Sequence, residues 1–259
     1  MEVRSLHQDK KTGHLSFLIK GTTASFTNAV RRAAMQEVPT LAIETVEIRK
    51  NNSVLYDEMV AHRLGLVPIK TDLKSYDLST KCKCNNEGCA KCQLKLTLKT
   101  KGGNVTSGKL KSTDPKATPT HEGLLIAKLL KGQELEVEAT ATLGLGKDHM
   151  KWSPGHIWFT KQPTVTVNNK SSKLSEMKSK YPPQIFDKKG LIDKNLILEH
   201  NLVDACDIIC EDIVKVAYNK DAFVVQVEPF GQLPAKTMIV EACNVLDEKL
   251  EEFAGLLKE

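Results

Sequence analysis

The chain has 259 residues, of which 41% are hydrophobic and 27% charged, and its formal net charge is +5. This composition is ordinary for a globular protein of one large or two modest domains. No apolar run is long enough to span a bilayer, and none lies near the start with basic flanks. We therefore expect a cytoplasmic protein without membrane contact. The basic residues are scattered and only 5% of residues are aromatic, which gives little support to direct nucleic-acid binding.

The first forty residues predict a strand followed by an amphipathic helix. Residues 14–19 alternate at period two, as in a half-buried strand. Residues 22–37 predict a helix, with a threonine cap at its start and a proline after its end. One face of this helix is apolar, and core packing is the favoured explanation of that face. The residues on it are Phe26, Val30 and Ala33. Arg31 and Arg32 point away from it.

The middle of the chain predicts mostly strands. They are expected at 41–49, 93–101, 126–130, 134–143 and 157–167, with a helix at 56–64 and tight turns at 102–104 and 131–133. The polar segment 168–183 predicts a flexible connector or domain boundary. Residues 200–219 predict a helix, and residues 222–228 predict a strand.

The last element is a long helix that follows Gly231 and Pro234. Its apolar positions recur every three or four residues and form a seam about five turns long. We call this set the α-seam: Ile239, Ala242, Leu246, Leu250, Phe253 and Leu257. Such a seam packs either against the chain's own sheet or against a partner protein, and the sequence alone leaves both open.

Four of the seven cysteines fall within eleven positions, which is the one strong chemical motif. They are Cys82, Cys84, Cys89 and Cys92. Four thiolates close a tetrahedral shell around Zn²⁺, so the predicted site is structural and has no open position for hydrolysis. Metal-free surface cysteines and a four-thiolate iron–sulfur cluster are the weaker alternatives. No HExxH, Gly-x-Ser-x-Gly or complete phosphate-loop motif occurs, so no active site is predicted.

Two blocks of sequence carry a specific family resemblance. Residues 26–48 contain Phe-Thr-Asn-Ala-Val-Arg-Arg followed by Glu-Val-Pro-Thr-Leu-Ala-Ile, and residues 52–68 contain Asp-Glu-Met-Val-Ala-His-Arg-Leu-Gly-Leu-Val-Pro. Together they resemble the family of archaeal RNA polymerase D subunits, which is related to the eukaryotic third-largest subunit and the bacterial alpha amino-terminal domain. Residues 131–135, 146–154 and 228–234 match as well, so the resemblance covers most of the chain.

The resemblance implies an α+β fold with two domains. A discontinuous dimerisation domain, built of sheet and helices from both chain ends, would comprise residues 1–43 and 157–259. An inserted, mostly β domain of residues 44–156 would carry a zinc knuckle. Residues 168–215 correspond to a ferredoxin-like insertion, but Tyr181, His200 and Val203 stand where that pattern has cysteines. We therefore expect no iron–sulfur cluster, with Cys206 and Cys210 as ordinary helix residues.

The resemblance also implies a function. The family is a non-catalytic assembly subunit that pairs with the small L subunit, joins the small N and P subunits and the large catalytic subunits, and meets DNA only through the assembled polymerase. Asn28, Arg31 and Arg32 fall at the family's assembly interface, and with Phe26 and the α-seam they form the predicted partner surface. Two alternatives remain. One is a free-standing zinc-containing nucleic-acid-binding protein, and the other is an iron–sulfur redox protein.

Overall fold

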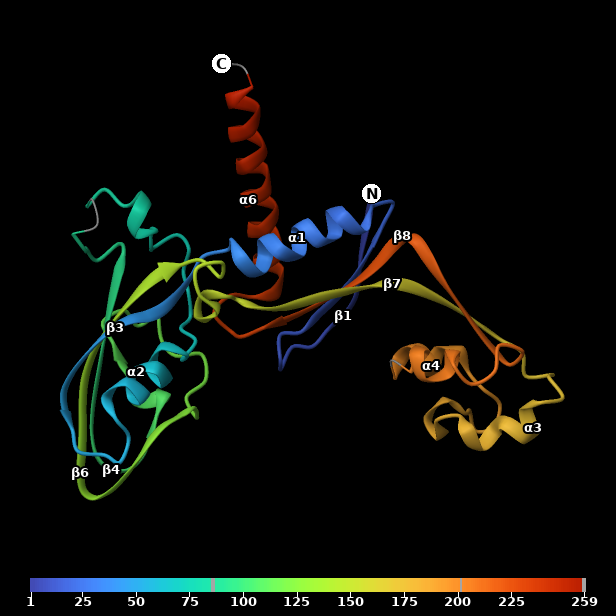
Figure 1. Ribbon diagram of the computed structural model, residues 1–259, viewed down its shortest axis with the longest axis horizontal. Helices are drawn as coiled ribbons and strands as arrows, with labels where there is room; N and C mark the ends of the chain where they lie inside the picture. The colour runs from blue at the N-terminus through green and yellow to red at the C-terminus, as the bar shows by residue number, and fades with distance from the viewer. Residues whose placement is uncertain (85–86, 201, 258–259) are drawn as a thin grey trace. The chain divides into compact units, whose positions relative to one another are not determined.

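The computed structural model describes residues 1–84, 87–200 and 202–257, and it contains two four-stranded sheets (Figure 1). The mixed α+β class predicted from the sequence is confirmed. The chain forms two compact units. The smaller one comprises Met1–Arg4, Leu18–Ala24 and Phe159–Val224, and the larger one comprises Ser5–Phe17, Ser25–Trp158 and the chain from Val225 onward. Within the described residues, no helix has both the length and the apolar character needed to cross a lipid bilayer.

The first sheet takes its strands from both ends of the chain. Its order is β1-β2-β8-β7, and the strands are β1 (Glu2–Gln8), β2 (Leu15–Lys20), β7 (Gly155–Val167) and β8 (Val214–Pro229). The predicted strands at 14–19, 157–167 and 222–228 are therefore present. In β2, Phe17, Leu18 and Ile19 are buried, so this strand is covered on both faces and reads as a continuous apolar run.

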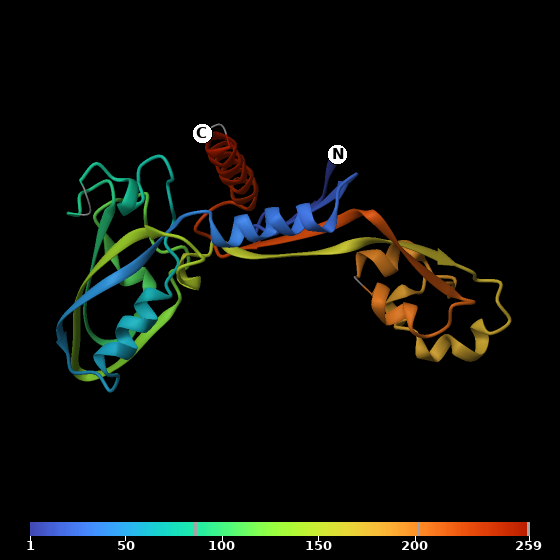
Figure 2. The ribbon, with the colours of Figure 1, turned by 45° about the horizontal axis from the view of Figure 1, so that its top comes forward.

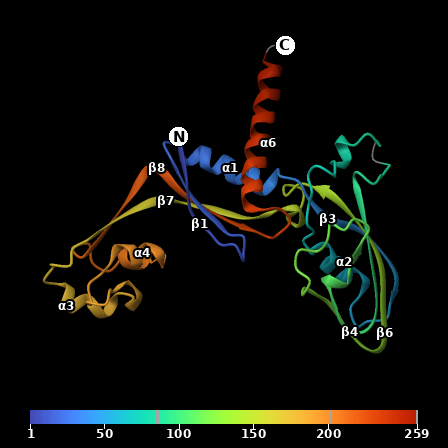
Figure 3. The same cartoon turned by 180° about the vertical axis from the view of Figure 1, so that it is seen from behind.

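The second sheet lies within the larger unit. Its order is β3-β6-β4-β5, with antiparallel pairing throughout, and its strands are β3 (Thr40–Asn51), β4 (Gln93–Thr106), β5 (Lys111–Ser112) and β6 (Leu125–Gly144). Leu94, Leu96 and Leu98 alternate with exposed residues, so one face of β4 is buried. Figure 3 shows helix α2 (Asp57–Gly65) beside this sheet, and its buried Val60 and Leu64 belong to the same core.

The tight turns predicted at 102–104 and 131–133 are wrong. Strands β4 and β6 each run through the glycine-containing segment. Lys101 pairs with Glu134, whereas Gly103 pairs with Leu129. The extra residues of β6 form a large bulge opposite Gly102, and Gly102, Gly103 and Gly132 all have positive φ. The same backbone freedom that glycine gives a turn is here used to bend two paired strands.

Residues 165–214 form a small folded core in the smaller unit. The helices are α3 (Leu174–Met177), α4 (Lys194–Glu199) and α5 (Val203–Asp207), with 3₁₀ turns at Lys178–Lys180 and Pro183–Ile185. Their buried residues include Tyr181, Ile185 and Ile197. The flexible connector predicted at 168–183 is therefore folded, and the helix predicted at 200–219 is wrong, because β8 begins at Val214. Cys206 lies in α5, but Cys210 lies beyond it.

Helices α1 (Ala24–Gln36) and α6 (Ala235–Leu256) belong to the larger unit, apart from Ala24. Figure 2 shows α6 rising from the α1 region. Val30, Ala33 and Ala34 are buried on α1, and Ala235, Met238 and Ala242 are buried on α6. The long helix predicted after Pro234 is present, and its buried residues all lie in its first half.

A hydrogen-bonded junction connects the second sheet to the C-terminal end of α1 and the N-terminal end of α6. It includes the 3₁₀ turn Met150–Trp152. Thr40 Oγ1 donates to the Trp152 carbonyl over 2.6 Å, and Gln232 Nε2 donates to the Ser153 carbonyl over 3.2 Å. The Thr71 amide donates to the Gln232 carbonyl over 2.9 Å. These N–H, O–H and C=O groups are buried at a point where the chain passes between secondary-structure elements. Each therefore needs a hydrogen-bond partner within the protein.

Gly146 lies against the end of α1, where a side chain has no room. A Cβ atom at Gly146 would collide with the Met35 carbonyl oxygen, and the Lys147 amide donates to the Gln36 carbonyl beside it over 3.0 Å. Gly146→Ala should lower the free energy of unfolding by about 1–3 kcal/mol, the range for overpacking. Gly123→Ala is the matched control, because no atom lies within 4 Å of its Cβ position. Equal denaturant midpoints for the two variants would contradict this account of the contact.

Candidate metal centre and partner surface

The four cysteines predicted as metal ligands come together at one point. Four of the distances between their sulfur atoms are short: Cys82–Cys84 3.4 Å, Cys84–Cys92 3.5 Å, Cys82–Cys89 3.6 Å and Cys89–Cys92 3.8 Å. All four sulfurs lie within 4.8 Å of one another. Thiolates bound to zinc at about 2.3 Å in a tetrahedron lie about 3.8 Å apart. The spacing therefore fits one tetrahedral ion.

The backbone around Cys89 and Cys92 holds the second pair of sulfurs. The Cys92 and Gln93 amides both donate to the Cys89 carbonyl, over 3.0 and 2.9 Å, and the Cys89 amide donates to the Cys92 sulfur over 3.2 Å. Gly88 has a φ of +86°, and a Cβ there would collide with the Gln93 side chain. Because β4 begins at Gln93, this turn is joined directly to the second sheet.

The thiols have different proton affinities in the protein without metal. The hydrogen bond with Cys82 lowers the pKa of Cys84 to about 7, whereas burial raises the pKa of Cys92 to about 12. Zinc binds the thiolate form, so loading the site releases protons. All four ligand positions are supplied by sulfur, which leaves no place for a reacting water. The donor set therefore fits a structural ion.

Replacing one ligand tests the site. Cys84→Ser should lower zinc affinity by at least about 100-fold, since even changes to residues that only hydrogen-bond to the ligands cost about 10- to 100-fold. Zinc content per chain, measured by elemental analysis after dialysis against a weak chelator, should fall from about one to near zero. Cys243→Ser is the control, because Cys243 is exposed on α6, far along the chain from the cluster. Iron with acid-labile sulfide in stoichiometric amount would contradict a zinc site.

The α-seam is covered only in its first half. Ala242 is fully buried, and Ile239 and Leu246 are partly buried. Leu250, Phe253 and Leu257 are 63%, 59% and 72% exposed. The described part of the chain therefore leaves an apolar helix face uncovered at the C-terminal end of α6.

The predicted α1 residues have different surroundings, and of them Arg32 lies beside α6. Phe26 is 43% exposed, so the core packing expected for it is incomplete. Arg31 Nε donates to Asn28 Oδ1 over 3.0 Å, so these two side chains order each other. Arg32 is exposed and shares a groove of about 190 Å³ with Leu246. The structure thus brings Arg32 and the α-seam together.

Glu37 is a residue that sequence reasoning missed. Its carboxylate binds Lys249 Nζ of α6 over 2.8 Å and Lys147 Nζ over 3.4 Å. Burial of Glu37 opposes ionisation, but the hydrogen bonds and charges of Lys249 and Lys147 outweigh it and lower the pKa of the carboxyl group. The ion pairs join three segments that are distant in the sequence. No local pattern in the sequence marks them.

Removing the Glu37 charge should destabilise the protein in a pH-dependent way. Because the folded pKa is lowered, the stabilisation is present above pH 4.5, the ordinary pKa, and is lost as the pH falls through the folded pKa. Glu37→Gln should therefore lower the free energy of unfolding by about 1 kcal/mol at pH 7, and the difference from the parent should shrink in acid. Exposed Glu251→Gln is the control. A difference that stays constant down to strongly acid pH would contradict the ion-pair account.

Comparison with known proteins identifies the relatives of this chain. Residues 46–158 match the RNA polymerase Rpb3/RpoA insert domain. A DNA-directed RNA polymerase subunit Rpo3 from Methanosarcina mazei is 35% identical, with 99% of this chain and 98% of that protein covered. The Rpo3 proteins of Methanosphaera stadtmanae and Archaeoglobus fulgidus are 32% and 31% identical, each with 97% of this chain and 97% and 96% of their own lengths covered.

The two sheets, the four-cysteine knuckle and the insert-domain match define a non-catalytic RNA polymerase subunit of the Rpb3 and RpoA type. The full-length similarity is more specific. The chain belongs to the Rpo3 family of DNA-directed RNA polymerase subunits, and the resemblance to the archaeal D subunits drawn from the sequence is confirmed.

Proposed function

We propose that this chain is the assembly subunit of an archaeal RNA polymerase, which pairs with the small L subunit and then receives the large catalytic subunits and the small N and P subunits. In this proposal the protein acts in the cytoplasm and meets DNA only through the assembled polymerase. Family membership supports a role inside a multi-subunit enzyme. The observation that most strongly supports a directly bound partner is the exposed half of the α-seam.

Three apolar side chains on α6 would supply the binding energy of such a contact. Leu250, Phe253 and Leu257 are each more than half exposed on one helix face. Burial of such a side chain contributes about 1.5–3 kcal/mol, so a partner that covered all three would gain several kcal/mol before its own ordering costs. Exposed Arg32, which lines a groove with Leu246, extends this surface onto α1. Mixed aromatic, aliphatic and arginine character is typical of the centre of protein interfaces.

The two sheets also support a proposal for the domain organisation. We propose that residues 1–43 and 157–259 form the dimerisation domain and that residues 44–156 form the inserted domain. The first sheet, built from both chain ends, and the insert-domain match at 46–158 support these boundaries. The zinc knuckle would hold the loop before β4 without chemistry of its own. Residues 168–215 would be a ferredoxin-like insertion without a cluster, with a packed apolar core in its place.

A free-standing nucleic-acid-binding protein is the alternative. It would use the knuckle and the net positive charge, but it gives no reason for the exposed apolar face of α6. Salt-dependent DNA binding by the isolated chain would favour it. The described structure carries no specific observation in its support.

A single charge on the exposed half of α6 tests the pairing. Phe253→Asp should abolish co-purification with a co-expressed L subunit, because covering a carboxylate without a partner costs several kcal/mol. Phe253 is 59% exposed, so the thermal midpoint of the isolated chain should stay within about 2 °C of the parent, as for most surface substitutions. Asn244→Asp places the same charge on the opposite side of the helix and should leave pairing intact. Undiminished binding of the L subunit by the Phe253 variant would refute the proposed surface.

A further inference from the structure

The outer edge of β7 in the smaller unit has one unprotected segment. β7 is an edge strand, because β8 is its sole neighbour in the sheet order of the described residues. Lys161 and Pro163 interrupt the middle of β7 with a charge and a residue that has no amide hydrogen. Natural proteins use both devices to block edge pairing. After Pro163 the strand reads Thr-Val-Thr-Val over residues 164–167, with no charge, no proline and high strand propensity.

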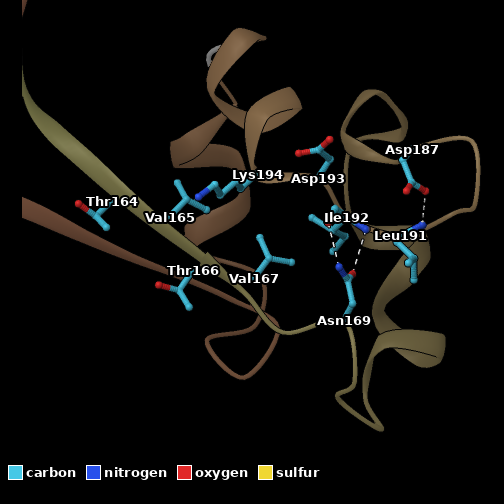
Figure 4. A pocket seen from close by; sticks show the side chains of 10 residues that line it. All are labelled: Thr164, Val165, Thr166, Val167, Asn169, Asp187, Leu191, Ile192, Asp193 and Lys194. Carbon is cyan, nitrogen blue, oxygen red and sulfur yellow. Dashed lines mark hydrogen bonds between the residues drawn. The ribbon is translucent and has the colours of Figure 1, made fainter.

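A groove of about 590 Å³ lies along this unprotected segment (Figure 4). Residues 164–167 form one side, and Asp187 and the 191–194 segment lie across from them. The far side is fixed, because the Asn169 amide group donates to the Ile192 carbonyl over 3.0 Å and accepts from the Ile192 amide over 2.9 Å. The turn from Asp187 is also held, since its carboxylate accepts from the Leu191 amide over 2.9 Å. Hydrogen bonds therefore hold the side of the groove opposite β7 in place.

The hydrogen-bonding groups on the edge of β7 determine the backbone conformation of a molecule that can bind in the groove. Residues of an edge strand present alternate N–H and C=O groups sideways, and only an extended chain satisfies them in sequence. Four residues of edge extend about 13 Å, enough for a four-residue strand. Val165 is buried and Val167 partly buried, whereas Thr164 and Thr166 are exposed. An added strand would continue this alternation, with its inward side chains near Leu191, which is 41% exposed.

The ionisable residues that line the groove further restrict the chemistry of the occupant. These residues are Asp187, Asp193 and Lys194, so two of the three are carboxylates. A carboxylate on the wall of the groove can pair with a cationic side chain of the occupant. We propose that this groove docks an extended segment of a partner polypeptide as a fifth strand beside β7, with alternating apolar and polar side chains and at least one lysine or arginine that reaches Asp187. This site is independent of the α-seam.

A defined probe tests the backbone pairing. The probe is a fluorescein-labelled hexapeptide, Val-Lys-Val-Thr-Val-Lys, titrated into the full chain and followed by fluorescence anisotropy and by amide hydrogen exchange at residues 164–167. Two further versions carry N-methyl groups, one on the three valines and the other on the three polar residues. Alternate amides point to opposite edges of a strand, so one methylated version should lose binding and the other should retain it. The exchange of edge-facing amides at 164–167 should slow when the parent peptide binds.

A charge variant tests the assigned orientation. Asp187→Asn keeps the turn acceptor but removes the charge, and it should weaken peptide binding about two- to fivefold, the range for an exposed ion pair. Glu199→Gln makes the same charge change outside the groove and should leave binding unchanged. Equal effects of the two methylations, or no slowing at 164–167 with millimolar peptide, would overturn the proposal. So would protection at 164–167 that rises with protein concentration alone, because a second copy of the chain would then be the occupant.

Discussion

The larger unit depends on the hydrogen-bonded junction between the second sheet, the C-terminal end of α1 and the N-terminal end of α6. The chain leaves the α1 region at Thr40, builds the whole second sheet and returns through Trp152 and Ser153. At this point main-chain groups are buried away from the ladders of either sheet, and side chains must satisfy them. Thr40 and Gln232 do so from opposite ends of the sequence. The second sheet is thereby connected to both helices that carry the proposed partner surface, and Glu37 adds an ion pair with Lys249 of α6.

The four cysteines lie in a loop whose described residues contribute little to the core. Of the described residues between the 3₁₀ turn Ser79–Lys81 and the start of β4, only Cys82 and Cys92 are buried. Four sulfurs within 4.8 Å of one another can be held by one ion, and such an ion would take the place of apolar packing in ordering the loop. In the smaller unit the opposite solution is found. Tyr181 and Cys206 are buried there in an apolar core.

The sequence predicted local chemistry well and long-range geometry poorly. Spacing alone placed the four cysteines in one site, and apolar periodicity located α1 and α6. The glycines at 102, 103 and 132 indicated a change of direction, but a turn and a bulge require the same positive φ, and only the partner strand distinguishes them. The helix predicted at 200–219 overlaps α5, but its apolar pattern does not reveal that a strand begins at Val214. Glu37, Gln232 and the β7 groove depend on residues far apart in the chain, so no window of sequence contains their signal.

The split character of α6 bears on how fast and how tightly a partner could associate. The first half of the helix is already packed against the chain, and Lys249 is paired with Glu37. Its exposed half therefore extends from an anchored base as an already formed helix with a defined direction. A binding partner would not have to supply the conformational entropy of folding this segment, a cost that weakens many interactions of disordered tails. More of the contact energy would then remain as net affinity, and encounter could proceed without a slow folding step.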